Sequence, residues 1–159
     1  MAKAAERQLL ANKFIQDALA YAESARRLDK LCGTKPKTRF VSPMYFLLGH
    51  AIELTLKAYL LASGVSAATL RNKVGHDLER AFQRAKNHGL GPANDRFPQL
   101  VSWLAPYHLD HSFRYRQAKG SGSVSYPSVT EAADIIDDTA TAIEPYVRQK
   151  LLATGYRMK

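Results

Sequence analysis

The sequence predicts an all-α fold: an antiparallel bundle of four main helices plus one or two short helices, forming one domain over residues 1–159. Three observations predict it. Apolar residues recur at steps of three and four over long segments, capping and stop residues bound those segments, and no stretch has the apolar–polar alternation typical of a strand.

The first two main helices are predicted over residues 4–28 and 43–62, joined by a basic loop at 30–41. For the second, Ser42 is the expected N-cap and Gly64 the expected stop. The apolar face of the first helix comprises Leu10, Phe14, Ala18, Tyr21, Ala25 and Leu28.

Two shorter helices and a turn of helix are predicted next. The turn lies at 66–72 with Ser66 as its cap, and a helix at 76–88 ends at Gly89. A further helix at 95–107 is expected to be capped by Asn94 or Asp95. The inward residues are Leu78, Ala81, Phe82 and Ala85 in the first of these helices, and Phe97, Leu100, Val101 and Leu104 in the second.

The last main helix begins with a capping box, Ser128-x-x-Glu131, after an irregular segment at about 108–127, and stops at Gly155. Its expected apolar face is Ala132, Ile136, Ala140, Ile143 and Val147. The acidic residues Asp134, Asp137 and Asp138 lie opposite that face and are predicted to be solvated.

A polar stripe interrupts the otherwise apolar segment 43–62. His50, Glu53 and Lys57 lie at positions i, i+3 and i+7, so they share one side of the helix. Buried charged groups are rare unless they are paired or functional. Two interpretations follow. In the structural one, Glu53 pairs with Lys57 and His50 is hydrogen-bonded nearby, or Glu53 is buried against an arginine. In the functional one, the stripe lies in a cleft where His50 and Glu53 bind a nucleotide.

The chain has 23 basic and 14 acidic residues, for a net charge of +9, which favours polyanionic partners such as nucleic acid. No apolar run is long enough to span a bilayer, and the N-terminus lacks the apolar core of a signal peptide. The lone cysteine, Cys32, suits a reducing compartment. We therefore expect a cytoplasmic protein with no membrane partner.

A set of motifs resembles the HEPN family of helical domains. The set comprises His50-Ala51-Ile52-Glu53-Leu54 followed by Leu56-Lys57-Ala58-Tyr59-Leu60, then Gly64, Gly75-His76-Asp77-Leu78, Gly89-Leu90 and Phe113-Arg114-Tyr115. The resemblance implies a bundle that usually forms a homodimer. Many members are metal-independent ribonucleases, often toxins or defence effectors, and others bind RNA or nucleotides without catalysis.

The nuclease members of that family carry an Arg followed after four to six residues by His, often with Asn after the Arg. Arg71-Asn72-Lys73-Val74-Gly75-His76 has this form. Histidine moves protons near neutral pH, and the planar arginine fork holds phosphate, so the catalytic candidates are Arg71 and His76. The structural alternative is that His76 or Asp77 caps the helix that follows.

The segment 107–116 holds the remaining candidates. His108 and His111, with Asp110 between them, have no further ligand at matching spacing, so we predict no metal site and no cofactor. Arg114 either reaches Glu53 across the bundle or forms, with Arg116, a phosphate-binding patch beside Tyr115.

The function expected from the sequence is a domain that binds RNA or nucleotides, with ribonuclease activity of the toxin type as the enzymatic form. The alternative is a non-catalytic helical module that binds a partner protein such as a nucleotidyltransferase. A ferritin-like metal enzyme is disfavoured because the chain has no Glu-x-x-His pair.

Overall fold

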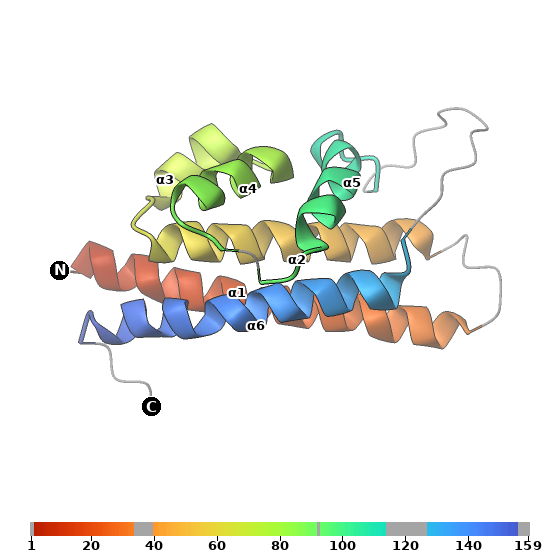
Figure 1. The fold of residues 1–159 in the computed structure, drawn as a ribbon, viewed down its shortest axis with the longest axis horizontal. Helices are drawn as coiled ribbons and strands as arrows, with labels where there is room; N and C mark the ends of the chain where they lie inside the picture. Colours follow the sequence, from red (N-terminus) through yellow and green to blue (C-terminus); the bar gives the residue numbers. More distant parts are fainter. Residues whose placement is uncertain (1, 34–39, 92, 114–126, 156–159) are drawn as a thin grey trace.

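A computed structural model describes residues 2–33, 40–91, 93–113 and 127–155, and the described residues are helical with no strand. The three long helices α1 (Ala2–Cys32), α2 (Val41–Ala62) and α6 (Val129–Leu152) pack side by side, and α1 runs opposite to the other two (Figure 1). The all-α prediction is confirmed.

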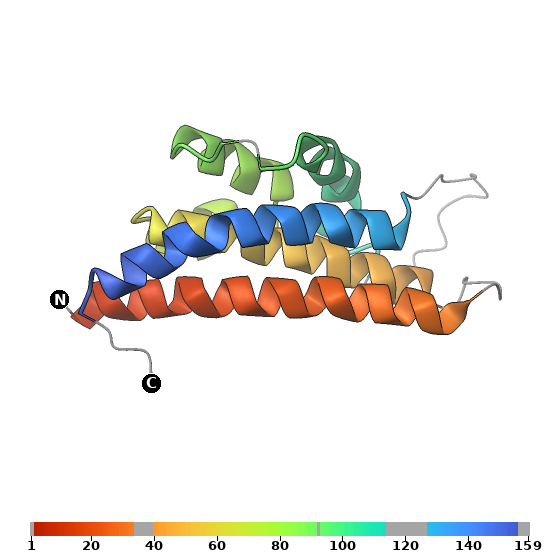
Figure 2. The same cartoon turned by 60° about the horizontal axis from the view of Figure 1, so that its bottom comes forward.

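The shorter elements cover the side of α2 that faces away from α1, as a second view also shows (Figure 2). They are α3 (Ala67–Thr69), the π-helical turn η2 (Leu70–Val74), α4 (Leu78–Asn87) and α5 (Phe97–Leu109). Because α1 and α6 cover one side of α2 and this layer covers the other, α2 is the central helix. None of the helices in the described ranges is long and apolar enough to cross a membrane.

The core follows the predicted apolar faces of α4, α5 and α6, but the face predicted for α1 is wrong in part. Ala18 and Ala25 are buried as predicted, whereas Leu10, Phe14, Tyr21 and Leu28 are only partly buried, and Ala11, Ile15 and Ala22 are fully buried instead. In α2, Ile52, Leu56 and Leu60 are fully buried, and every inward residue predicted for α4, α5 and α6 is buried. Burial of a large aliphatic side chain contributes about 1.5–3 kcal/mol, so this central packing dominates the stability of the bundle.

Several helix ends differ from prediction. The helix α2 begins at Val41, with Phe40 as an N-cap that makes no side-chain bond, so the prediction of Ser42 as cap is wrong. In α5 the N-cap is Arg96 rather than Asn94 or Asp95, and the helix continues to Leu109. The predicted caps Ser66 and Ser128 are confirmed, since each accepts a hydrogen bond from a backbone N–H three residues later.

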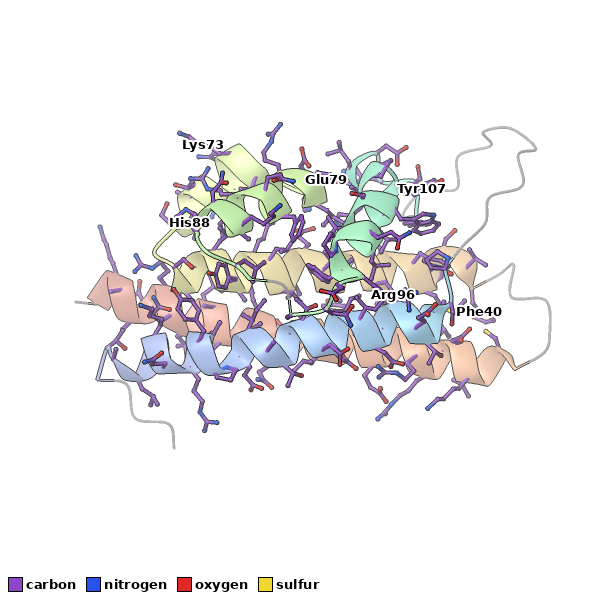
Figure 3. The ribbon with its side chains drawn as sticks, viewed as in Figure 1. Phe40, Lys73, Glu79, His88, Arg96 and Tyr107 are labelled. Carbon is purple, nitrogen blue, oxygen red and sulfur yellow. The ribbon has the colours of Figure 1, made fainter. Side chains whose placement is uncertain are left out.

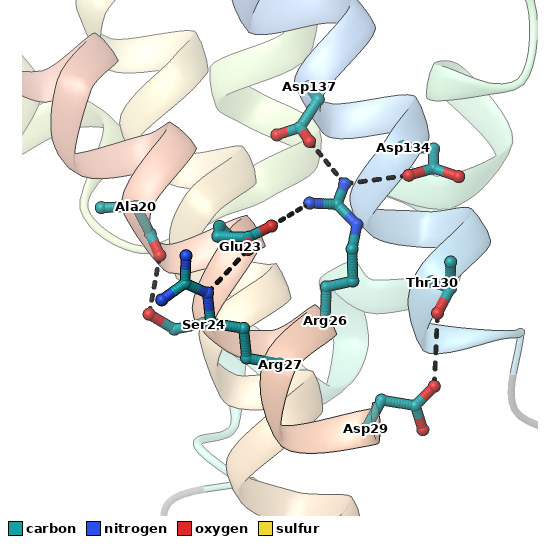
Figure 4. Close-up of polar contacts among 9 residues, drawn as sticks. All are labelled: Ala20, Glu23, Ser24, Arg26, Arg27, Asp29, Thr130, Asp134 and Asp137. Atoms are coloured by element: carbon teal, nitrogen blue, oxygen red, sulfur yellow. Dashed lines mark hydrogen bonds and ion pairs between the residues drawn. The ribbon is translucent and has the colours of Figure 1, made fainter. Parts of the chain in front are cut away.

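An ion-pair network joins α1 to α6 (Figure 4). Arg26 donates hydrogen bonds to Glu23 on its own helix and to Asp134 and Asp137 on α6. Burial opposes the charge of Arg26, but the bonds to Asp137, Glu23 and Asp134 outweigh it and raise the pKa of the guanidinium.

The acidic face of α6 is exposed at Asp134 and Asp138, as predicted, but its carboxylates also bind side chains of other elements. Asp134 and Asp137 bind Arg26, and Asp138 accepts a hydrogen bond from Asn94 at 2.8 Å. The helical period placed these carboxylates correctly away from the apolar stripe, but it could not show which polar side chains of other elements lie beside them.

We expect Arg26→Ala to lower the free energy of unfolding by about 1–2 kcal/mol, because it removes both the ion pairs and the packing of the arginine stem. The matched control is Arg27→Ala. The Arg27 side chain is 75% exposed and, within the part of the chain that the structure describes, pairs with Glu23 alone, so we expect this change to cost at most about 0.5 kcal/mol. Urea unfolding of both variants checks this, and equal costs would contradict the bridging role of Arg26.

Candidate active site

The site is built around one buried carboxylate, Glu53, in the middle of α2. Its side chain is only 4% exposed, yet three side chains contact its two oxygens. His108 Nε2 lies 2.6 Å from Oε2, His76 Nδ1 lies 3.0 Å from Oε2, and Lys57 Nζ lies 2.5 Å from Oε1. The predicted Glu53–Lys57 pair is thus present, but within a larger cluster that unites three segments.

Lys57 and the histidines determine the charge state of Glu53. Burial alone would raise the pKa of this carboxyl group, because a low-dielectric interior disfavours the anion. The hydrogen bond of His108, the nearby His50 ring and the ammonium group of Lys57 oppose that effect and hold the pKa of Glu53 well below its ordinary value. Glu53 is therefore a permanent anion at neutral pH.

His108 comes from the last turn of α5 and is buried against α2. A glycine makes this approach possible: a Cβ atom added at Gly49 would lie 2.7 Å from His108 Nδ1. The ring is therefore held between the backbone of α2 on one side and the Glu53 carboxylate on the other. The sequence prediction ended the helix at Tyr107 and did not pair His108 with Glu53.

His76 lies in the short connection between η2 and α4, and both ends of that connection are fixed. The π-helical turn ends at Gly75, whose φ of +60° and ψ of −126° suit glycine far better than other residues. Asp77 then caps α4 by accepting a hydrogen bond from Arg80 N at 2.9 Å. Of the two alternatives for the cap, Asp77 is confirmed, while the His76 side chain turns to Glu53.

The hydrogen bond to Glu53 sets the tautomer of His76. A carboxylate only accepts, so the proton of the neutral imidazole lies on Nδ1, and Nε2 carries the lone pair. The His76 side chain is 46% exposed, unlike that of His108, which is 4% exposed. Glu53 thus orients a half-exposed histidine whose second nitrogen can accept a proton.

A cavity of about 280 Å³ adjoins His76. Its polar lining includes Lys57, Arg71 and His76, and its apolar lining includes Phe14 and Leu70. Arg71 reaches the cavity from η2, so the structure brings the two predicted catalytic residues to one place. Lys73 belongs to the same turn as Arg71 and extends outward from it (Figure 3).

His50 is close to the cluster without being bonded to it. Its Nδ1 atom lies 3.9 Å from Glu53 Oε2, beyond hydrogen-bond distance, and the ring packs against Tyr21 and Phe46 with centroids 4.8 Å and 5.9 Å apart. Neither His50 nor Glu53 lines the cavity beside His76. Their predicted part in nucleotide binding has no direct geometric support in the described residues.

Of the remaining candidate residues in segment 107–116, some lie beyond the described residues and others lie in the turn after α5. Arg114 and Arg116 lie outside the described residues, and so does the predicted contact of Arg114 with Glu53. His111 follows α5 with a φ of +59°, and its ring centroid lies 5.7 Å from that of His76. Asp110 accepts a bond from the backbone N–H of Ser112, and so serves the turn.

The fold and the site together define an all-α protein in which a buried carboxylate on the central helix holds two histidines from the covering layer. The chain matches no protein-family model, no curated protein and no solved structure. What it does must therefore be argued from its own residues.

Proposed function

We propose that this chain is a HEPN-like domain that binds RNA and cleaves it without a metal, as a ribonuclease of the toxin or defence type. The observation that carries the proposal is the Glu53–His76 hydrogen bond, which leaves His76 Nε2 as a proton acceptor beside Arg71. A net charge of +9 supports attraction to a polyanion.

The chemistry assigns one role to each side chain. His76 Nε2 takes the proton of a ribose 2′-hydroxyl, and the 2′-oxygen attacks the adjacent phosphorus. The bond from phosphorus to the 5′-oxygen breaks, and that oxygen takes a proton from the imidazolium or from water, which yields a 2′,3′-cyclic phosphate and a 5′-hydroxyl. Arg71 stabilises the charge that develops on the phosphate, and Glu53 stabilises the imidazolium.

The cavity also suits a nucleotide. Its volume is near the lower end of small-ligand pockets, which begin at about 300 Å³. The Phe14 ring offers an apolar surface for a base, while Arg71 and Lys57 offer cations for phosphate. The proposal includes a homodimer, in which the exposed Arg71 and half-exposed His76 of two copies face a common cleft.

The test is cleavage of single-stranded RNA in the presence of EDTA. We expect His76→Ala to lower the rate at least about 100-fold, the usual contribution of a positioned acid–base group, and a substrate lacking the 2′-hydroxyl to resist cleavage. The matched control is His88→Ala. His88 is exposed and follows the C-terminal end of α4 (Figure 3). His76 precedes the N-terminal end of that helix, whose ten residues span roughly 15 Å.

Three outcomes would overturn parts of the proposal. Unchanged cleavage in His76→Ala would remove the assigned site. RNA binding at low salt without any cleavage would show a binding domain, and failure to bind RNA at all would favour the alternative, a helical module for a partner such as a nucleotidyltransferase.

A further inference from the structure

Three potential ligand atoms from three different segments converge at the centre of the site. One carboxylate oxygen of Glu53 and one ring nitrogen each of His76 and His108 lie within 4.8 Å of one another. One carboxylate with two imidazoles is a ligand set that binds Zn²⁺ and related ions. We propose that these residues form a binding site for a divalent transition metal, with Zn²⁺ the best fit, and that its occupation switches off the proposed nuclease.

The distances require only small adjustments. Ligand atoms about 2.0–2.1 Å from a tetrahedral metal lie roughly 3.3 Å from each other. The two histidine nitrogens lie 2.6 Å and 3.0 Å from Oε2, so a small shift of the Glu53 carboxylate away from the fixed His108 ring, with outward rotation of the half-exposed His76 ring, opens room for the ion. The half-exposed His76 ring provides an entry path and leaves at least one coordination position to water.

The surroundings supply the second layer of contacts that metal sites usually have. Lys57 binds Oε1 and therefore leaves Oε2 available to the metal. The buried Nδ1 atom of His50 makes no hydrogen bond to the described residues and lies 3.9 Å from Oε2. A metal-bound water would give that nitrogen the partner it lacks.

The donor set also selects the metal. Mg²⁺ and Ca²⁺ prefer oxygen ligands, whereas imidazole nitrogen suits Zn²⁺, Co²⁺ and Ni²⁺. The positive charge of Lys57 reduces the attraction of Glu53 for a cation, so we expect micromolar rather than tighter affinity.

Occupation of the site changes the chemistry of His76, a consequence that rests on the proposed function. In the empty site the proton lies on Nδ1 and Nε2 accepts. A metal bound to Nδ1 forces the proton of the neutral ring onto Nε2. The nitrogen that would take the 2′-hydroxyl proton is then already protonated, so the metal inhibits cleavage.

Metal binding is testable without any activity assay. Metal-free protein with no affinity tag is titrated with Zn²⁺ in a calorimeter and with Co²⁺ by visible absorption. We expect one ion per chain, no binding of Mg²⁺, and at least tenfold weaker binding in His76→Ala and in His108→Ala. His88→Ala and Arg71→Ala should bind as the wild type does, and circular dichroism verifies that each variant is folded.

The outcomes separate the two proposals. Absence of Zn²⁺ and Co²⁺ binding, or equal binding by the wild type, His76→Ala and a folded His108→Ala, would overturn the metal site. Metal binding by a protein that never cleaves RNA would support the site and reject the nuclease. Cleavage in EDTA that stoichiometric Zn²⁺ stops, in wild type and His88→Ala alike, would support both.

Discussion

Glu53→Gln is expected to lower the free energy of unfolding by about 3–5 kcal/mol, although the two side chains have nearly the same shape. The change removes the one anion among the described residues that pairs with the Lys57 ammonium group, and the Lys57 side chain is 13% exposed. It also places an amide where two histidine N–H groups and an ammonium all need an acceptor. Unfolding in urea, followed by circular dichroism, measures the loss.

A double-mutant cycle separates the charge effect from the shape effect. Lys57→Met removes the stranded cation, so in that background Glu53→Gln should cost at least about 2 kcal/mol less than it does alone. A cost below about 1 kcal/mol for the single variant would mean that Glu53 is not held as a buried anion in solution. It would also weaken the account of His76, because the same anion orients its ring.

Gly49→Ala is expected to lower the free energy of unfolding by about 2 kcal/mol, the opposite of the usual gain from replacing a helical glycine by alanine. The new Cβ atom would lie 2.7 Å from His108 Nδ1, and the ring cannot retreat because Glu53 lies 2.6 Å from its other nitrogen. Relief of the clash breaks the His108–Glu53 bond. Unfolding in urea, as for Glu53→Gln, measures this loss of stability.

Two controls isolate this contact. Gly91→Ala adds a Cβ atom to open space and should change stability by less than about 0.5 kcal/mol. In a His108→Ala background, Gly49→Ala should become neutral or stabilising, by up to about 1 kcal/mol, since helix propensity alone then acts. A destabilisation that persists in that background would place the clash elsewhere.

Glu53 connects the fold to the chemistry. Its side chain is hydrogen-bonded to Lys57 on its own helix, to His108 of α5 and to His76 in the connection before α4, so it both fastens the covering layer and orients His76. Variants of Glu53 therefore change stability and any activity together. Arg71 is exposed on η2, so its replacement should change activity with little effect on stability.

The sequence was informative about the helices because their evidence is local. The N-cap at Ser128, the stop at Gly64 and the apolar faces of α4, α5 and α6 each depend on residues within a few positions of one another. The misplaced ends arose where the local signal was ambiguous. Ser42 suits a cap chemically, but the turn at Phe40 lets α2 begin two residues earlier, at Val41.

The partners of the polar stripe were predictable only in part. Lys57 lies four residues from Glu53 on one helix, so helical geometry alone brings them together. His108 is 55 residues away in sequence, and no local pattern links it to Glu53. Two signals were available: Gly49, a glycine inside an apolar helix, and His108, a polar residue in the last turn of α5. Together they indicate that a side chain packs closely on the backbone of α2.

The sequence by itself determined an all-α chain, its central apolar helix and the polar residues that helix carries, because helical periodicity is a property of neighbouring residues. Only the tertiary structure decided that Glu53 is shared by His76 and His108, and that Arg71 and His76 line one cavity. The physical reason is that a buried charge must find its partners among whatever side chains the packing of other helices brings within reach.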